Sequence, residues 1–185
     1  MRVIAGVAKG HKLISPKGLG TRPTSDRAKE SIFNIIADKI PEAKVLDLFA
    51  GSGAFGIEAL SRGAQTAVFV ENNQIAIDII YKNLAKTSLD KRAVVLKKSA
   101  HNFFVNYTDK NGQYDLIFFD PPYKINYGVL DSLLKELVAR RVLSDNGLVI
   151  LEHSSKVSPV AIEVNLNLKF TRIYGDTSVS FFELV

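Results

Sequence analysis

Residues 44–56 read KVLDLFAGSGAFG, an apolar run that passes directly into a glycine-rich loop. The run Lys44–Phe49 is typical of a buried strand, and helix-forming residues follow Gly53. Gly51, Gly53 and Gly56 fit the pattern G-x-G-x-x-G, whose glycines let a ligand approach the backbone at a helix N-terminus. The stretch predicts a nucleotide-binding strand–loop–helix unit, for which the alternative is an ordinary tight turn.

Strands and helices continue to alternate after this unit, and such repeats predict a parallel sheet sandwiched by helices. Two further strand-like runs flank Gly175-Asp176-Thr177, which indicates a C-terminal antiparallel hairpin. The expected fold class is therefore α/β, with a seven-stranded, mostly parallel sheet. Strands are expected over residues 44–49, 65–71, 93–96, 114–119, 147–152, 168–174 and 178–184, and helices over 54–62, 72–86, 100–107 and 127–140.

The first 40 residues precede this alternation. Arg2–Ile14 is expected to form a short hairpin, and apolar residues from Ala28 to Ile40 recur at helical spacing until Pro41 stops the helix. Residues 1–30 hold seven basic and two acidic residues, so they carry the whole formal net charge of +5. A cationic end on a neutral body suggests an anionic partner, although a solvated basic surface has the same composition.

Composition excludes several classes of protein. At 46% hydrophobic and 23% charged residues the chain is not disordered, and without cysteine it has no disulfide, no Cys-based zinc site and no thiol catalysis. No apolar run has the length of a transmembrane span, and the N-terminus does not resemble a signal peptide, so a cytoplasmic location is expected. The three histidines lack metal-ligand spacing, and no metal is expected.

Two acids narrow the choice of ligand for the glycine loop. Glu71 ends the second strand, where a carboxylate can accept hydrogen bonds from ribose hydroxyls. Asp47 lies four residues before Gly51, and there it would repel the pyrophosphate of a dinucleotide but suit a cationic group. S-adenosylmethionine carries an ammonium and a sulfonium in place of the pyrophosphate. A P-loop is excluded because no Gly-Lys-Ser/Thr follows the glycines.

Asp120-Pro121-Pro122-Tyr123 follows the fourth strand directly. Ligands of open parallel sheets bind at the carboxyl ends of the strands, so this tetrapeptide should face the glycine loop. Its prolines remove N–H donors and leave carbonyls and the Asp120 carboxylate as acceptors for an exocyclic amine, while Tyr123 can stack on a base. The alternative is an ordinary Pro-Pro turn.

Together these motifs resemble the class I S-adenosylmethionine-dependent methyltransferases, and most closely the RsmD family of 16S rRNA guanine-N2 methyltransferases. The resemblance covers nearly the whole chain. It rests on the opening segment Arg2–Gly10, the signature Arg22–Asn34, the cofactor loop Asp47–Gly53 and the tetrapeptide at Asp120. It implies one methyltransferase domain over 1–185 with a Rossmann-like fold, in which residues 1–40 are a basic N-terminal extension and 41–185 the catalytic core.

The resemblance further implies methyl transfer to the N2 amine of a guanine in 16S rRNA, within an assembling small ribosomal subunit, by a protein expected to be a monomer. One departure is Ser99, which stands where many class I enzymes carry an acid for the cofactor adenine. The implied catalytic residues are Asp120, Pro121, Pro122 and Tyr123; those for the cofactor are Asp47, Phe49, Ala50, Gly51, Ser52, Gly53, Glu71, Asn72, Ser99 and Ala100; those for RNA are Arg2, Lys9, Lys12, Arg22, Thr24, Arg27 and Lys29.

Other functions remain open from the sequence. Adenine-N6 methyltransferases of DNA or RNA use the same tetrapeptide, although no separate target-reading domain is evident for DNA. An NAD-dependent enzyme would share the glycine loop but has no use for Asp47 or the Pro-Pro turn, and a non-catalytic RNA-binding module needs neither ligand loop. Arg27 and Lys29 have an alternative role, which is to stabilise their helix beside Glu30.

Overall fold

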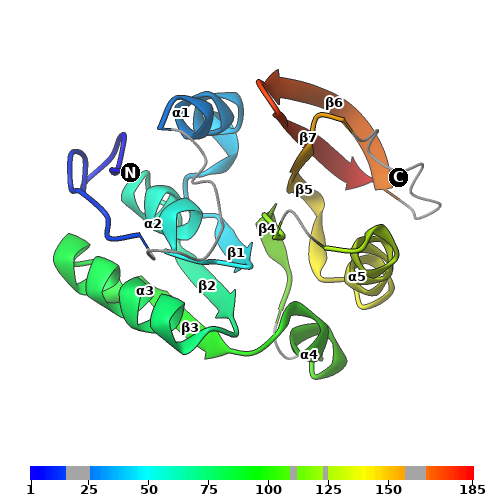
Figure 1. Cartoon of the computed structure of the whole chain (residues 1–185), viewed down its shortest axis with the longest axis horizontal. Helices are drawn as coiled ribbons and strands as arrows, with labels where there is room; N and C mark the ends of the chain where they lie inside the picture. The colour runs from blue at the N-terminus through cyan, green and yellow to red at the C-terminus, as the bar shows by residue number, and fades with distance from the viewer. Residues whose placement is uncertain (16–25, 109–111, 123–124, 157–165) are drawn as a thin grey trace.

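The computed structural model describes residues 1–15, 26–108, 112–122, 125–156 and 166–185. Within these ranges seven strands form one sheet in the order β3-β2-β1-β4-β5-β7-β6 (Figure 1). The strands are β1 Lys44–Leu48, β2 Thr66–Glu71, β3 Ala93–Lys97, β4 Tyr114–Phe119, β5 Leu143–Ser154, β6 Leu166–Tyr174 and β7 Thr177–Leu184.

The sheet has the mostly parallel, Rossmann-like methyltransferase arrangement that the sequence predicts. β1 pairs in parallel with both β2 and β4, and β4 pairs in parallel with β5. β7 lies antiparallel between β5 and β6, which confirms the C-terminal hairpin. β5 begins at Leu143 rather than at the predicted Gly147, because its pairing with β4 jumps from Leu143 to Leu148 and this irregularity interrupts the apolar alternation.

Helices cover both faces of the sheet (Figure 1). One face packs against α1 Asp26–Ile35, α2 Ala54–Ser61 and α3 Gln74–Thr87; the other packs against α4 Ala100–Val105 and α5 Tyr127–Ala139. The first helix is shorter than predicted. It ends at Ile35, and the short 3₁₀ turn Ala37–Lys39 follows it before Pro41. No helix in the described ranges is long and apolar enough to cross a membrane.

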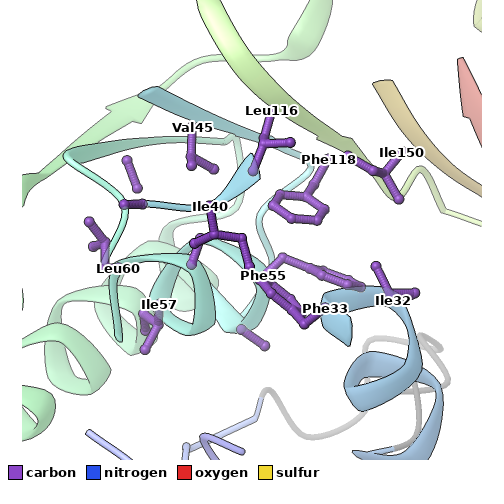
Figure 2. Close-up of a cluster of buried hydrophobic side chains, with 14 of the residues drawn as sticks. Ile32, Phe33, Ile40, Val45, Phe55, Ile57, Leu60, Leu116, Phe118 and Ile150 are labelled. Atoms are coloured by element: carbon purple, nitrogen blue, oxygen red, sulfur yellow. The ribbon is translucent and has the colours of Figure 1, made fainter. Parts of the chain in front are cut away.

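Three aromatic rings fix α1 and α2 on the first face of the sheet (Figure 2). The centroid of Phe33 lies 5.4 Å from that of Phe118, and the centroid of Phe55 lies 5.0 Å from it. Such pairs stabilise a core beyond the area that they bury. Gly56 permits the same close packing, since a Cβ there would lie 2.4 Å from the Phe69 ring of β2.

Residues 1–15 contain the predicted short hairpin. Arg2 and Lys12 form an antiparallel bridge, and backbone hydrogen bonds join Val3 to His11 and Leu13 to Met1 across it, at 2.9 and 3.1 Å. The backbone N–H groups of Ile4 and Ala5 donate to the Glu58 carboxylate of α2, at 2.8 and 3.0 Å. The segment, called the N-terminal loop below, is therefore a hairpin bound to α2, and hydrophobic alternation alone does not reveal that attachment.

Candidate active site

The carboxyl ends of β1, β2 and β4 meet at one edge of the sheet. In the register of the strands, Leu48 of β1 lies opposite Val70 of β2 and Phe119 of β4. The glycine loop, Glu71 and Asp120 follow these positions directly, so the structure brings the two predicted motifs to the same edge. Open parallel sheets bind their ligands at such an edge.

The glycine loop turns sharply between β1 and α2. Phe49, Gly51 and Gly53 all have positive φ angles, of 61°, 55° and 76°. Phe49 is not a glycine, so this conformation costs about 1–2 kcal/mol, and such strain is concentrated at functional sites. A Cβ on Gly51 would meet only the Phe49 carbonyl, at 3.9 Å. The backbone at Gly51 thus has open space beside it, as close approach of a ligand requires.

Glu71 is oriented by three backbone N–H groups. Its Oε2 accepts from Gly51 at 2.9 Å, and its Oε1 accepts from Asn72 and Asn73 at 2.8 Å each. A carboxylate has about four lone-pair positions, so one is left for a ribose hydroxyl. If two ribose hydroxyls bind there, one backbone bond has to open. The exposed Asn72 contributes its N–H to this arrangement.

Asp47 lies beneath the glycine loop with only 1% of its surface exposed. Its Oδ2 accepts the Gly56 N–H at 2.9 Å, which ties β1 to the first turn of α2. The pKa of Asp47 is raised to about 8: burial raises it most, the hydrogen bond from Gly56 lowers it, and the negative charge of Glu71 raises it. At neutral pH this carboxyl is mostly protonated, and a cationic ligand nearby would favour its ionised form.

The remaining predicted cofactor residues surround the loop and the end of β3. Ala50 is buried, and the Ser52 carbonyl accepts a hydrogen bond from Asn83 of α3 at 2.9 Å. Ser99 is the N-cap of α4, and its Oγ accepts the Asn102 N–H at 3.1 Å. The Ser99 hydroxyl therefore serves the helix first, and the buried Ala100 follows it as the first helical residue.

Asp120 opens onto a pocket at the ends of β4 and β5. Burial raises the pKa of Asp120 well above its usual range, and the negative charges of Glu152 and Asp47 raise it further. The Pro122 carbonyl accepts the Ile125 N–H at 2.8 Å, which closes the turn that follows β4. Tyr123, the fourth residue of the motif, lies outside the described residues. The pocket is lined by Asp120, Pro121, Pro122, Ile125, Leu130, Glu152, His153 and Ser154.

Sequence reasoning missed the contribution of β5 to this pocket. Glu152, His153 and Ser154 come from the end of that strand. The available signal is the run GLVILE at residues 147–152, an apolar strand that ends in an acid in the same way as β2. Only the sheet order, with β5 beside β4, reveals that this acid adjoins Asp120.

The residues predicted to bind RNA divide into three groups. Arg2, Lys9, Lys12 and Arg27 are exposed, and Arg2 also lies 3.8 Å from Asp26. Arg22 and Thr24 lie outside the described residues.

The prediction that Lys29 binds RNA is wrong, because its side chain is fully buried. Its Nζ lies 2.9 Å from the buried Glu58 carboxylate and donates to the Arg2 carbonyl at 2.7 Å. Burial raises the pKa of Glu58, but the Lys29 charge and the hydrogen bonds from Ile4, Lys29 and Arg62 lower it more, so that it ends below its usual value. Lys29 therefore holds the N-terminal loop against α2 instead of meeting a phosphate.

Among the described residues, no group of three or more His, Asp or Glu side chains could hold a metal ion.

Comparisons with known proteins cover the chain almost end to end. Residues 1–183 match the family described as Conserved hypothetical protein 95. Ribosomal RNA small subunit methyltransferase D of Escherichia coli K12 is 33% identical over 183 residues, which cover 99% of this chain and 89% of that protein. YlbH of Bacillus subtilis strain 168 is 37% identical, over 99% of this chain and 98% of its own length. The solved structure of the Escherichia coli protein yhhF is 32% identical and covers 100% of this chain and 97% of its own, with a TM-score of 0.87.

Proposed function

Because this chain belongs to the ribosomal RNA small subunit methyltransferase D family, we propose that it methylates the N2 amine of a guanine in 16S rRNA, with S-adenosylmethionine as methyl donor. One observation carries the proposal: the glycine loop after β1 and Asp120 after β4 lie at the same edge of the sheet, on adjacent strands. The proposed cofactor site and the proposed amine-binding site would thus be next to each other, as transfer between two bound molecules requires.

The residues around the glycine loop fit S-adenosylmethionine, whose sulfonium makes its methyl group electrophilic. Glu71, held by three backbone N–H groups, would take a ribose hydroxyl. The loop N–H groups suit the methionine carboxylate, and the buried Asp47 suits the cationic part of that end. A pyrophosphate fits less well, because the buried Asp47 carboxyl gains a favourable charge interaction only by ionising beside a cation, and this disfavours an NAD-dependent function.

On the acceptor side, Asp120 and the Pro121 carbonyl would hold the N2 amine of a guanine. Hydrogen bonds to both N–H groups favour a pyramidal nitrogen, which exposes its lone pair for attack on a methyl group. The new N–C bond leaves the nitrogen positively charged, and the nitrogen then releases a proton. The ionised Asp120 carboxylate can accept that proton without being a strong base, because the nitrogen becomes acidic once the methyl group is attached. Stacking of Tyr123 on the base completes the proposed site.

The exposed cations Arg2, Lys9, Lys12 and Arg27 would contact RNA phosphates at one side of the molecule. Such a surface suits an rRNA segment, and we propose an assembling small ribosomal subunit as its setting. We further propose that the protein acts as a monomer in the cytoplasm. An adenine-N6 methyltransferase is the second candidate, and the base that accepts the methyl group distinguishes the two.

The test is methylation of 16S rRNA from cells that lack this modification, as naked RNA and as small-subunit particles. We expect one guanine to gain an N2-methyl group, located by mass spectrometry of nuclease fragments. Asp120→Asn should lower kcat by about 10²–10⁴-fold and leave S-adenosylmethionine binding unchanged. Asp131→Asn on the outer part of α5 is the matched control and should retain activity. Methylation of an adenine, or full activity of Asp120→Asn, would contradict the proposal.

A further inference from the structure

Glu152 lies next to Asp120 at the ends of two adjacent parallel strands. In the β4–β5 register Phe119 lies opposite Leu151, so Asp120 and Glu152 are the next residues on their strands. Both line the same pocket, and Glu152 is only 6% exposed. Neither the family motifs nor the proposed cofactor site gives Glu152 a role.

The two carboxylates also interact at the ends of their strands. Ile150 belongs to the cluster under α1 and α2, whereas Leu151 belongs to the cluster under α4 and α5. Because side chains alternate along a strand, Glu152 of β5 is on the same face as Ile150, and Asp120 directly follows the end of β4 beside it. Their charges interact, since the Glu152 carboxylate contributes to the raised pKa of Asp120.

The strand order determines which ligand Glu152 would meet. The glycine loop and Glu71 belong to β1 and β2, on one side of β4, while β5 lies on the other side. Glu152 is thus separated from the proposed cofactor residues by Asp120 and its strand. Ile125 and Leu130 form an apolar part of the pocket wall.

We propose that Glu152 selects guanine, by accepting the N1–H of the target base while Asp120 holds its N2 amine. The N1–H and the N2 amine are adjacent donors on one edge of guanine, and two adjacent carboxylates are matching acceptors. Adenine has a lone pair at N1, which an acceptor carboxylate repels. This inference rests on the proposed function, and it assigns the specificity of that reaction to β5.

The test uses RNA in which the mapped target guanine is replaced by 2-aminopurine, which keeps the N2 amine but has no N1–H. The wild-type protein should methylate this RNA about 10- to 100-fold less efficiently, in kcat/KM, than the guanine RNA. In Glu152→Ala the guanine RNA should lose that advantage, so that both RNAs react at similar rates. Glu152→Gln, which keeps the shape of the side chain, should reduce the advantage and guards against loss of folding in the alanine variant.

Two controls separate base selection from a structural effect. Glu183→Gln changes an acid of β7 that forms an ion pair with Lys169 and should preserve the wild-type preference. The affinity of each Glu152 variant for S-adenosylmethionine, measured by calorimetry, should stay within about twofold of wild type. If both Glu152 variants keep the full preference for guanine over 2-aminopurine, the inference is overturned and the proposed reaction stands. If the wild-type protein methylates no guanine, both fail.

Discussion

Asp47 makes the stability of the folded chain depend on pH in an unusual direction. Its pKa is about 8 in the folded protein, against an ordinary value of 3.8, mainly because it is buried. Between these values the folded state keeps a proton that the unfolded state releases. The free energy of unfolding therefore decreases as pH rises from about 4 to about 8.

Asp47→Asn tests this effect, because the amide oxygen can still accept the Gly56 N–H and has no proton to lose. Relative to the variant, the wild-type protein should lose about 4 kcal/mol of stability between pH 5 and pH 8, measured by urea unfolding at each pH. Parallel stability curves for the two proteins would show that Asp47 ionises as freely as an exposed acid.

Single residues also show where sequence reasoning fails. Asp47, Glu71 and Asp120 are each at the end of an apolar strand or next to a glycine or proline motif, so their place at the sheet edge could be predicted. Lys29 could not, because its partner Glu58 is 29 residues away and both side chains become buried only when α1 packs on α2. The same limit concealed Glu152, whose neighbour depends on strand order.

At the scale of elements, Asn83 of α3 connects the N-terminal loop to the glycine loop. Its Oδ1 accepts the Ile14 N–H at 2.8 Å, and its Nδ2 donates to the carbonyls of Ile14 and Ser52, both at 2.9 Å. The Asn83 side chain is fully buried, whereas Ile14 is exposed, so these bonds are partly shielded from water. The position of Ser52 thus depends on a residue outside the nucleotide-binding pattern.

Asn83→Ala should destabilise the protein by about 2–3 kcal/mol, because it removes three hydrogen bonds and leaves buried backbone groups without these partners. It should also weaken S-adenosylmethionine binding, since the Ser52 end of the loop is released. Thermal unfolding and calorimetric titration measure the two effects. Lys82→Ala, one residue earlier on the exposed side of α3, is the control and should change neither. Unchanged cofactor affinity in a destabilised Asn83→Ala would restrict Asn83 to a purely structural role.

The sequence predicts those helices and strands that pack against other helices and strands. Apolar runs locate the seven strands, and Gly53 marks the start of α2. The start of β5 does not follow, because a local irregularity determines it, and neither does the attachment of the N-terminal loop to the Glu58 side chain of α2. The spacing of apolar residues indicates which face of a helix or strand is buried, but not which distant group covers that face.

For the whole molecule, the charge at the N-terminal end is best tested without deleting the segment. Removing residues 1–15 would take Val3, Ala8 and Leu13 out of the core and strip Glu58 of its backbone partners. A truncated chain would therefore lose stability together with its cations. Charge-neutralising substitutions of exposed residues separate these effects.

The double variant Lys9→Gln/Lys12→Gln should bind 16S rRNA more weakly and reduce the slope of log K against log salt concentration by about 1.5, if both cations contact phosphates. Lys169→Gln, at the opposite edge of the sheet, is the matched control and should leave that slope unchanged. Filter binding at several salt concentrations gives the slope. An unaltered slope in the double variant would place the RNA contact elsewhere.

The attachment of residues 1–15 to α2 and α3 also determines the order of events during translation. Their partners Glu58, Ser61 and Asn83 lie more than 50 residues later in the chain. At about 5–20 residues per second, this segment waits roughly 4–15 s before Asn83 is synthesised. The nascent chain thus presents a basic and partly apolar N-terminal arm until α3 emerges.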